Sequence, residues 1–504
     1  MTGLHRTTLT TSRKIECAAA ALARQHEHGS KTALSRAYEV SRPTVYAVSA
    51  AAESVLRAHF ETRLLEGTAV NVRIDDAQLR RALVALRVMA PNSLRAIEDL
   101  LPLLYPGVRV SYGKIQQLLV EAEEQARVFN TQAQLSGIEA GALDEMFSQG
   151  EPVLAGVDLD GGYLFGLELS ATRDAAAWAA MLGDGQAQGL ALSVVVKDAA
   201  RGIAAGVREV FPQAEQRDDC FHALYEMNKV RRRLEQRAYG AISKEVEAQA
   251  KLGTVRGQER DKREKLRRQL VWQQRCCREA VARFDAFEVA MRQVQEAIEC
   301  VDLDSGELRD ARQVQRLIEQ AAQQMAGLKE PRAKKVAGYL ENRAPGLALA
   351  MGALRPQLDA LAEHYPRDLV ALACRIWRLV AMVNKGQRRG QWREHQRHLL
   401  GAYAWLTQQL DARCDELLEA VKALLHRHHR ASSAIEGFNA ALRPYLYVHK
   451  GVTQGFLELF RAHFNLRTRR WGRHKGTSAH QCLTGEPVTD WLTVLGYPPS
   501  PARH

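Results

Sequence analysis

One apolar run near the middle of the chain constrains the fold more than any other feature. Residues Leu190–Val196 are apolar except for Ser193, and Lys197 and Asp198 follow them directly. A β-branched stretch of this kind predicts a buried central strand. Open α/β sheets carry their functional groups at the carboxyl ends of their strands, so the run places Asp198 at such an edge. Asp198 has a second interpretation, because Asp often caps helices and a helix is predicted from about Ala200.

The segments around this run predict the rest of an α/β domain. The period of the sequence changes at about residue 138, and an Asp-Gly-Gly junction at residues 160–162 is a strong hairpin signal. The predicted strands before the run are Leu143–Phe147, Pro152–Asp160 and Tyr163–Leu169. The predicted helices are Arg173–Leu182, before the run, and Arg201–Phe211, after it. A short last segment ends in Asp219–His222. The order β-β-β-α-β-α-β is that of an RNase H-like domain.

Three acidic residues compete for the first carboxylate of a site around Asp198. Asp144 lies on the first predicted strand, whereas Asp158 and Asp160 lie near the hairpin turn, where Asp is common. If the strand that contains Asp158 came first, only two strands would precede the helix, and the RNase H order needs three. We therefore favour Asp144. Glu145 alternates to the other face of the strand and is expected to lie outside the site.

A further carboxylate, Glu436, is predicted far downstream in a helix that is capped by Ser432 or Ser433. Asn439 and Arg443 follow at successive turns on the same face. Asn439 is predicted to hold a phosphate or a metal-bound water, and Arg443 to contact the DNA backbone. The spacing of Ser433 and Glu436 also fits a capping box, which would need no site.

His222 is a candidate supporting residue, because it follows the predicted strand next to the central one. It is expected either to orient a scissile phosphate or to make a structural hydrogen bond. Cys220, two residues earlier, is expected to pack in the core.

The composition favours nucleic acid as the partner and excludes other classes. A net charge of +12 favours a polyanionic partner. The eight cysteines show no C-x-x-C pair or metal-ligand spacing, which argues against a zinc site and fits a reducing compartment. The chain has no apolar signal segment and no run of 18 apolar residues, so we expect a cytoplasmic, nucleoid-associated protein with no membrane partner.

The first 65 residues predict a helical DNA-binding domain. Ala33 and Leu34 would pack one helix, and Ser41 would cap the next, with Pro43 tolerated in its first turn. This pattern is typical of a helix-turn-helix, whose second helix reads base edges with its first residues. The candidates for DNA contact are Arg42, Thr44 and Tyr46. An ordinary helical hairpin is the alternative.

Residues 66–136 predict a second unit of the same kind. Ser93 would cap one helix, and Ser111 would cap another that runs from Tyr112 to about Val128. The candidates for DNA contact here are Ser111, Tyr112 and Lys114. Near the end of the chain, basic residues surround Trp471, which suits phosphate contacts, with a disordered segment as the alternative. These basic candidates are Arg467, Arg469, Arg470, Arg473 and Lys475.

Residues 226–430 give little strand signal, and their heptad-like apolar spacing predicts long helices. Their basic stretches Val230–Arg237 and Arg256–Arg268 are either solvated faces or DNA contacts. We therefore predict a multidomain α/β chain in which a large all-helical insertion interrupts the RNase H-like domain. The predicted parts are residues 1–65 and 66–136 for the two DNA-binding units, 137–225 for the first part of the catalytic domain, 226–430 for the insertion and 431–504 for the Glu-bearing helix and basic tail.

These motifs resemble the DDE transposases of bacterial insertion sequences. The likeness lies in Leu143–Glu145, Val196–Asp198, Asp219–His222, Ser433–Asn439 and, further on, Leu442–Pro444 and Lys475–Leu483. It covers roughly residues 138–225 and 430–497. In such families a helical insertion commonly separates the last strand from the Glu-bearing helix. The Asp-x-Phe-His form is that of one subgroup and a Cys-x-x-His form marks another, so the subgroup stays open.

The resemblance implies a metal-dependent recombinase. Asp144, Asp198 and Glu436 would hold two Mg²⁺ ions, for which Mn²⁺ would substitute, and water would be activated to cleave at the transposon ends. The freed 3′-hydroxyls would then attack target DNA. The N-terminal units would bind the terminal inverted repeats in double-stranded DNA. Because both ends are processed together, a homo-oligomer of at least two chains is expected.

Two other functions fit the same residues. A non-catalytic helix-turn-helix regulator would bind DNA without divalent metal, and an Asp198→Asn change would leave its function intact. A structure-specific nuclease with the same three carboxylates would cut DNA without joining it.

Overall fold

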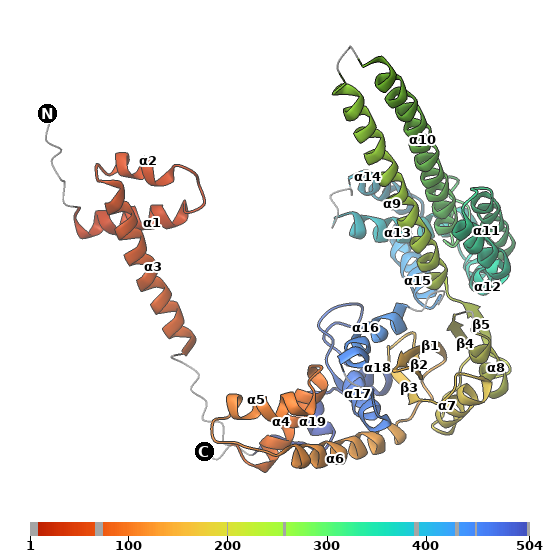
Figure 1. The fold of residues 1–504 in the computed structure, drawn as a ribbon. Helices are drawn as coiled ribbons and strands as arrows, with labels where there is room; N and C mark the ends of the chain where they lie inside the picture. The colour runs from red at the N-terminus through yellow and green to blue at the C-terminus, as the bar shows by residue number, and fades with distance from the viewer. Residues whose placement is uncertain are drawn as a thin grey trace. The chain divides into compact units, whose positions relative to one another are not determined.

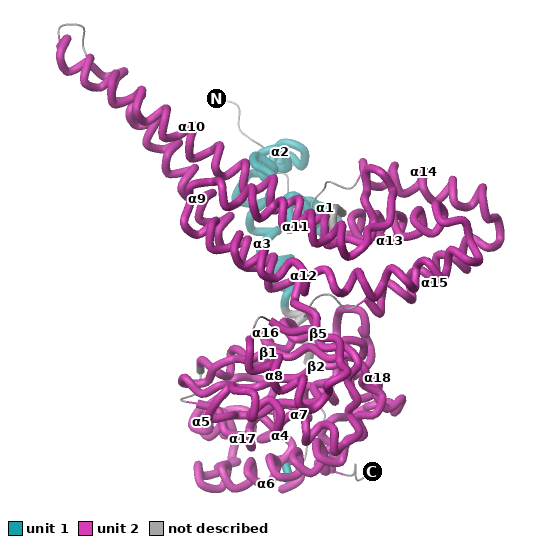
Figure 2. The backbone as a smooth tube through the Cα atoms, turned by 90° about the vertical axis from the view of Figure 1, so that its right-hand side faces the viewer, with its two compact units in different colours: residues 1–75 teal, residues 76–504 magenta. Residues whose placement is uncertain are grey.

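The computed structural model describes residues 9–65, 74–198, 200–255, 259–387, 393–428, 433–448 and 451–500 of the chain (Figure 1). The chain forms two compact units, residues 1–75 and residues 76–504, which have different colours in Figure 2. None of the described helices is long and apolar enough to cross a membrane.

The smaller unit packs three helices around one small core. The helices are α1 (Thr11–Ala23), α2 (Ser30–Ala37) and α3 (Arg42–Leu65). The buried residues of the core are Cys17, Ala21, Leu34 and Val45. At the start of α3 the Ser41 hydroxyl accepts a hydrogen bond from the Thr44 backbone N–H at 3.3 Å, so Ser41 caps this helix as the sequence predicts.

Three helices open the larger unit: α4 (Asp76–Met89), α5 (Leu94–Leu104) and α6 (Tyr112–Thr131). Ser93 and Ser111 cap α5 and α6, as predicted, by accepting from the backbone N–H groups of Ala96 at 3.1 Å and Lys114 at 3.4 Å. The apolar faces of these helices pack into the same core as one face of the sheet. The division of residues 76–504 into four parts stays a prediction.

A five-stranded mixed sheet forms the centre of the larger unit. Its strands are β1 (Ala140–Ser148), β2 (Glu151–Asp158), β3 (Leu164–Leu169), β4 (Val194–Lys197) and β5 (Glu215–Asp218). Their order in the sheet is β3-β2-β1-β4-β5. The first three strands pair antiparallel, whereas β4 runs parallel to both β1 and β5. With α7 (Ala175–Ala187) and α8 (Arg201–Val210) between the later strands, the element order is the predicted one.

Each face of the sheet is covered by its own set of helices. Leu143 of β1 and Val195 of β4 pack with Trp178 of α7 and with apolar residues of α8. On the opposite face, Ala142 packs with residues of α16 (Ser433–Val448) and α17 (Gln454–Leu466), among them Phe438. Two short helices, α18 (Ala479–Thr484) and α19 (Trp491–Val494), follow. Because side-chain direction alternates along β1, successive residues face α7 and α8 on one side and α16 and α17 on the other.

The observed elements differ from the predicted ones mainly at their ends. The helix expected from Arg173 begins at Ala175, because the Asp174 carboxylate accepts a hydrogen bond from the Ala177 N–H at 3.0 Å and caps it. The strand expected over the whole apolar run is confined to β4. Leu190 and Leu192, which precede it, are buried in the core beneath α7 and α8.

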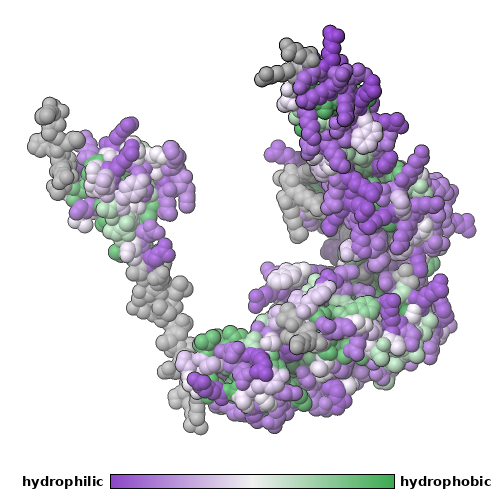
Figure 3. All heavy atoms as spheres, in the orientation of Figure 1, coloured by the Kyte–Doolittle hydropathy of each residue, from purple (hydrophilic) through white to green (hydrophobic). Residues whose placement is uncertain are grey.

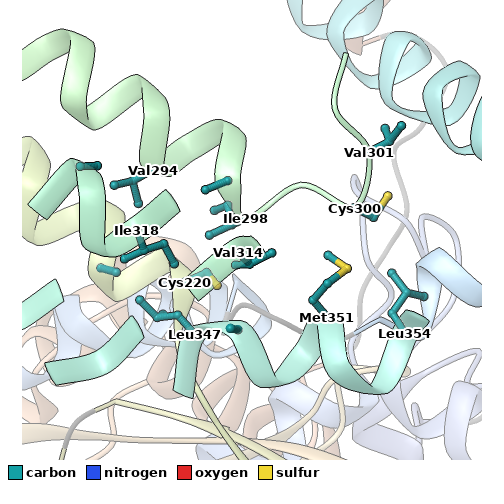
Figure 4. Packing of buried hydrophobic residues seen from close by; sticks show 14 of the residues in the cluster. Cys220, Val294, Ile298, Cys300, Val301, Val314, Ile318, Leu347, Met351 and Leu354 are labelled. Carbon is teal, nitrogen blue, oxygen red and sulfur yellow. The ribbon is translucent and has the colours of Figure 1, made fainter. Parts of the chain in front are cut away.

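A large helical insertion lies between β5 and α16 (Figure 1). Its helices are α9 (Cys220–Gly253), α10 (Arg260–Ala297), α11 (Ala311–Ala326), α12 (Pro331–Leu361), α13 (Arg367–Gln387), α14 (Arg393–Leu410), the 3₁₀ turn η1 (Asp411–Arg413) and α15 (Cys414–His426). Figure 4 shows Cys220, at the start of α9, packed near Ile318 of α11 and Leu347 of α12. The insertion core thus begins directly where the sheet ends.

The close packing of α7 on α8 yields a stability prediction. A Cβ at Gly206 of α8 would lie 2.6 Å from the Trp178 Cβ and 2.9 Å from the Ala175 carbonyl oxygen, so the two helices would have to move apart. We expect Gly206→Ala to lower the free energy of unfolding by about 1–3 kcal/mol.

Gly183 in α7 is the matched control, because a Cβ there would meet nothing within 4 Å. Gly183→Ala is expected to stabilise the protein by about 0.5–1 kcal/mol, since Ala is the better helix former. Urea denaturation of both variants measures the difference. Equal effects of the two substitutions would contradict the close α7–α8 contact.

Candidate functional site

The register of three parallel strands brings three carboxylates to one edge of the sheet. Leu143 pairs with Lys197 of β4, and Lys197 pairs with Asp218 of β5. The next residue on each of these chains is acidic: Asp144, Asp198 and Asp219. Because parallel strands keep their register, these three residues occupy neighbouring positions across the edge. The ladder continues to this point, since the Asp219 N–H donates to the Lys197 carbonyl oxygen at 2.9 Å.

Asp144 faces the α16 side of the sheet and is held by two hydrogen bonds. Its Oδ2 accepts from Asn439 Nδ2 at 2.7 Å, and its Oδ1 accepts from the Glu145 backbone N–H at 2.8 Å. Burial raises the pKa of Asp144 to about 6, although these two hydrogen bonds lower it in part. The negative charges of Asp198 and Glu436 also raise this pKa, so both carboxylates lie within electrostatic reach of Asp144.

Glu436 lies in the first turn of α16, one helical turn before Asn439. Burial raises the pKa of its carboxyl, and the charge of Asp219 raises it further, whereas Arg443 and His222 lower it. Helix α16 therefore directs Asn439 toward Asp144 while Glu436 lies within electrostatic reach of Asp219. Ser432, one of the two predicted caps of this helix, lies outside the described residues.

Asn439 is almost fully buried, at 3% exposure. Its Nδ2 is used by Asp144, but its Oδ1 meets no hydrogen-bond donor among the described residues. A buried acceptor without a donor is costly to maintain. The side chain therefore offers one carbonyl oxygen beside the carboxylates.

Asp198 caps a helix, which is one of the two interpretations that the sequence allowed. Its Oδ1 accepts a hydrogen bond from the Ala200 N–H at 2.7 Å, just before α8 begins, which is the role of a capping Asp. Its charge also raises the pKa values of Asp144 and Glu145, so the capping carboxylate lies within electrostatic reach of both.

Asp219 and His222 lie at the start of α9. Asp219 caps this helix, because its two carboxylate oxygens accept from the N–H groups of Phe221 at 2.8 Å and His222 at 3.1 Å. His222 is therefore in the first helical turn rather than in an extended segment after β5. Its ring centroid lies 6.2 Å from that of Tyr339 in α12. Cys220 is buried in the insertion core, as predicted.

Several residues at this edge were given no role from the sequence. Asp219 could have been found by the argument that identified Asp198, because it also ends a strand. Tyr339 and Arg343 gave no signal, because they reach the edge from α12 of the insertion. Arg343 Nη1 lies 3.5 Å from Asp218 Oδ1. Burial raises the pKa of Tyr339, and Asp218, Asp219 and Asp198 raise it further, so its phenol stays protonated at neutral pH.

Glu145 lies on the opposite face of β1 from Asp144, as the alternation predicts. Its Oε1 pairs with Arg173 Nη1 at 2.5 Å, and its side chain is only 7% exposed. Burial raises the pKa of Glu145, Arg173 lowers it, and the charge of Asp198 raises it. Glu145 is therefore within electrostatic reach of the carboxylate edge although it points to the other side.

The donor set at this edge suits a hard divalent cation. Among the described residues, no three His, Cys, Asp or Glu side chains lie close enough together to enclose one metal ion. Mg²⁺ does not require such a cage, because it keeps several waters and takes one or two carboxylates together with substrate phosphates. Burial is the main cause of the raised pKa of Asp144, the charges of Asp198 and Glu436 add to it, and a bound cation would lower this pKa. Asp144 and Asp198 fit such an ion by their chemistry.

The predicted DNA-contact residues of the two N-terminal helical segments lie on surfaces. Arg42 and Tyr46 are exposed in the first turns of α3, and Thr44 is half-buried between them. Ser111, Tyr112 and Lys114 are exposed at the start of α6. The backbone N–H of Tyr112 donates to Glu98 Oε1 at 2.9 Å, which places an acidic side chain beside this group.

The basic loop near the end of the chain, residues 467–475, is folded rather than extended. Arg469 donates to the carbonyl oxygens of Gly161 at 2.7 Å and Ser478 at 2.9 Å, so it ties the loop to the β2–β3 turn. The Arg467 guanidinium lies 4.5 Å from the centre of the Phe464 ring, and burial lowers its pKa. The exposed residues of the loop include Arg470, Trp471, Arg473 and Lys475.

The comparison with protein families gives one match. Residues 142–302 match the model of a family described as Transposase, Mutator family. The segment covers about a third of the chain and contains Asp144, Asp198 and Asp219, but it ends before Glu436. No curated protein matches the chain. The family match supports a transposase, and with it an enzyme that binds and processes DNA.

The raised pKa of Asp144 predicts a pH-dependent gain in stability when this carboxyl is removed. Its pKa of about 6 lies above the value of 3.8 for an unperturbed Asp, so ionising Asp144 destabilises the fold as the pH rises through this interval. The full effect is at most about 3 kcal/mol. In buffer with EDTA, Asp144→Asn should melt at a higher temperature than wild type at pH 8, and the difference should shrink toward pH 4.

Asp160→Asn is the control, because Asp160 is exposed at the β2–β3 turn. Its melting temperature should follow that of the wild type at every pH. A pH-independent difference for Asp144→Asn would show that ionisation of this carboxyl does not destabilise the fold.

The contacts of the basic loop predict that Arg469 contributes to stability, whereas Arg470 and Arg473 contribute to DNA binding. Arg469→Gln should lower the free energy of unfolding by about 1–3 kcal/mol, because several backbone acceptors lose their donor. The double change of Arg470 and Arg473 to Gln should leave the melting temperature unchanged and weaken binding to a DNA duplex. Thermal melting and fluorescence anisotropy separate the two effects. If Arg469→Gln weakened binding without loss of stability, its assignment to loop structure would be wrong.

Proposed function

We propose that this chain is a metal-dependent DDE transposase that binds the inverted repeats at transposon ends and catalyses DNA cleavage and strand transfer. The observation that carries the proposal is the parallel register that places Asp144 and Asp198 on neighbouring strands, with the Asp144 carboxylate within electrostatic reach of both Asp198 and Glu436. The Mutator family match over residues 142–302 supports the same reaction class.

The sheet supports an RNase H-like catalytic domain. Three antiparallel strands, β3-β2-β1, continue into the parallel strands β4 and β5; Asp144 lies on the central strand β1, and Asp198 directly follows its neighbour β4. The helical insertion separates β5 from the Glu436 helix, which is the arrangement that the resemblance implies.

In the proposed mechanism, Asp144, Asp198 and Glu436 would hold two Mg²⁺ ions, for which Mn²⁺ would substitute. The ions would activate the attacking hydroxyl and stabilise the leaving oxygen. Asn439 fixes the orientation of Asp144 through its 2.7 Å hydrogen bond. It is a positioning residue. His222 and Arg443 place positive charge or hydrogen-bond donors near Glu436, where they orient the scissile phosphate and the DNA backbone.

The proposed partners are double-stranded DNA, as transposon ends and as target, and further copies of the chain. The first residues of α3 and α6 would contact the ends, and the exposed cations of the basic loop would contact phosphates. Cutting and joining two ends together requires at least a dimer on DNA. A bacterial cell would hold such a protein at its nucleoid.

The test is an in vitro reaction with DNA that carries the repeats flanking the gene, together with a target plasmid. We expect cleavage and end joining in Mg²⁺ and none in EDTA. Asp198→Asn and Glu436→Gln should each reduce the rate by at least about 10²-fold, because each would remove several kcal/mol of stabilisation from the transition state. Asp160→Asn, which alters an exposed turn, should retain full activity.

A melting experiment tests Mg²⁺ binding separately from catalysis. Mg²⁺ should raise the melting temperature of the wild type and have a smaller effect on Asp198→Asn. Tight binding to the ends without cleavage in any divalent metal would favour the regulator. Cleavage without joining would favour the nuclease.

A further inference from the structure

Helices α9 and α10 form an arm that extends beyond the core of the insertion (Figures 1 and 2). The buried residues that the two helices contribute to that core end at Leu234 on α9 and begin at Phe287 on α10. Between residues 239 and 276 the contact between the two helices buries few of the described residues, among them Ala248. Within the larger unit, the described residues 239–255 and 259–276 therefore form an arm with most of its surface open to solvent.

The arm carries a large share of the positive charge. Residues 239–276 contain ten Lys or Arg and five Asp or Glu, a net charge of +5, against +12 for the whole chain. One of these cations, Arg256, lies outside the described residues. Figure 3 shows that the surface at the end of the α9–α10 pair is mostly hydrophilic. Less than a tenth of the chain thus holds more than a third of its net charge.

Ion pairs within the arm do not neutralise it. Lys262 pairs with Glu259 at 3.1 Å, and Arg268 pairs with Glu264, but these side chains are exposed and such pairs stabilise little. Arg263, Lys265 and Arg267 are also exposed on α10. One turn further on, Trp272 is 60% exposed. Cations beside an exposed aromatic ring suit the backbone of a nucleic acid.

The position of the arm is fixed by the site, because α9 is continuous from the Asp219 cap. From His222 the helix reaches residue 239 after about 25 Å and residue 253 after about 46 Å, at 1.5 Å per residue. These distances correspond to about 8–14 base pairs of duplex at 3.4 Å per step. DNA that enters the site and runs along α9 would therefore meet the cations of the arm over that interval.

We propose that the α9–α10 arm binds the phosphate backbone of duplex DNA about 8–14 base pairs from the reacting phosphodiester. The position relative to the site rests on the proposed function, whereas the binding of duplex DNA by the arm does not. A second copy of the chain is the less suitable occupant, because two arms of net charge +5 repel each other. The contacts are to phosphates and are independent of DNA sequence.

The experiment compares two triple variants of the full chain that remove equal charge. The arm variant changes Arg263, Lys265 and Arg267 to Gln. The control variant changes Arg312, Arg316 and Lys329 to Gln, which are exposed cations on and just after α11. Binding to a 40-base-pair duplex is measured by fluorescence anisotropy at several salt concentrations. Melting temperatures of both variants check that each is folded.

We expect the arm variant to bind at least about tenfold more weakly near 0.1 M salt and to show a salt slope about 2–3 units shallower, at roughly 0.9 per lost phosphate contact. The control should match the wild type. Equal losses in both variants, or no loss in either, would overturn the proposal. A change of oligomeric mass without DNA, with an unchanged salt slope, would assign the arm to self-association instead.

Footprinting on the transposon-end DNA tests the position. Protection should extend about 8–14 base pairs from the cleavage position in the wild type and be lost there in the arm variant. If the wild type fails to cleave while the arm variant still loses its salt slope, the proposed function fails and the DNA-binding arm stands. If the wild type cleaves and the arm variant keeps the salt slope of the wild type, the proposed function stands and the DNA-binding arm fails.

Discussion

The parallel pairing of β4 with β1 on one side and β5 on the other is the constraint on which the site depends. It places Asp144, Asp198 and Asp219 at adjacent positions, where their charges repel one another. Each of the three accepts at least one hydrogen bond from a backbone N–H one to three residues ahead in the chain. The backbone thus helps to hold each carboxylate in place and offsets part of the repulsion, and for Asp144 the distant Asn439 side chain adds a further hydrogen bond.

The sequence was sufficient where local rules decide the outcome. The apolar run before Asp198 and the count of strands before α7 predict the sheet, and Asp144 lies on its first strand as predicted, whereas the choice of Asp144 as the site carboxylate stays a prediction. Ser41, Ser93 and Ser111 cap helices where predicted, because capping depends on a side chain and the next few N–H groups. Glu436 lies within electrostatic reach of Asp144, and its role in a site with Asp144 and Asp198 stays a prediction.

Sequence reasoning failed where contacts join segments far apart in the chain. Tyr339 and Arg343 belong to a long helix whose sequence does not indicate what these two side chains meet, and only packing of α12 on β5 brings them to the edge. Arg469 lies within a basic run that suits phosphates, yet its guanidinium donates to backbone carbonyls. The periodicity of a sequence indicates which face of a helix is apolar, but it does not identify the partner of a polar side chain.

The cover of the sheet has a consequence for synthesis of the protein. One face of β1 and β2 packs on α16 and α17, which follow β5 only after the whole insertion has been made. At about 5–20 residues per second, ribosomes need roughly 10–50 s to pass from β5 to α17. During that time the face of the nascent sheet that packs on α16 and α17 lacks these two helices, and the Glu436 carboxylate is absent from the edge. A growing chain therefore carries an incomplete set of carboxylates until translation has passed the insertion.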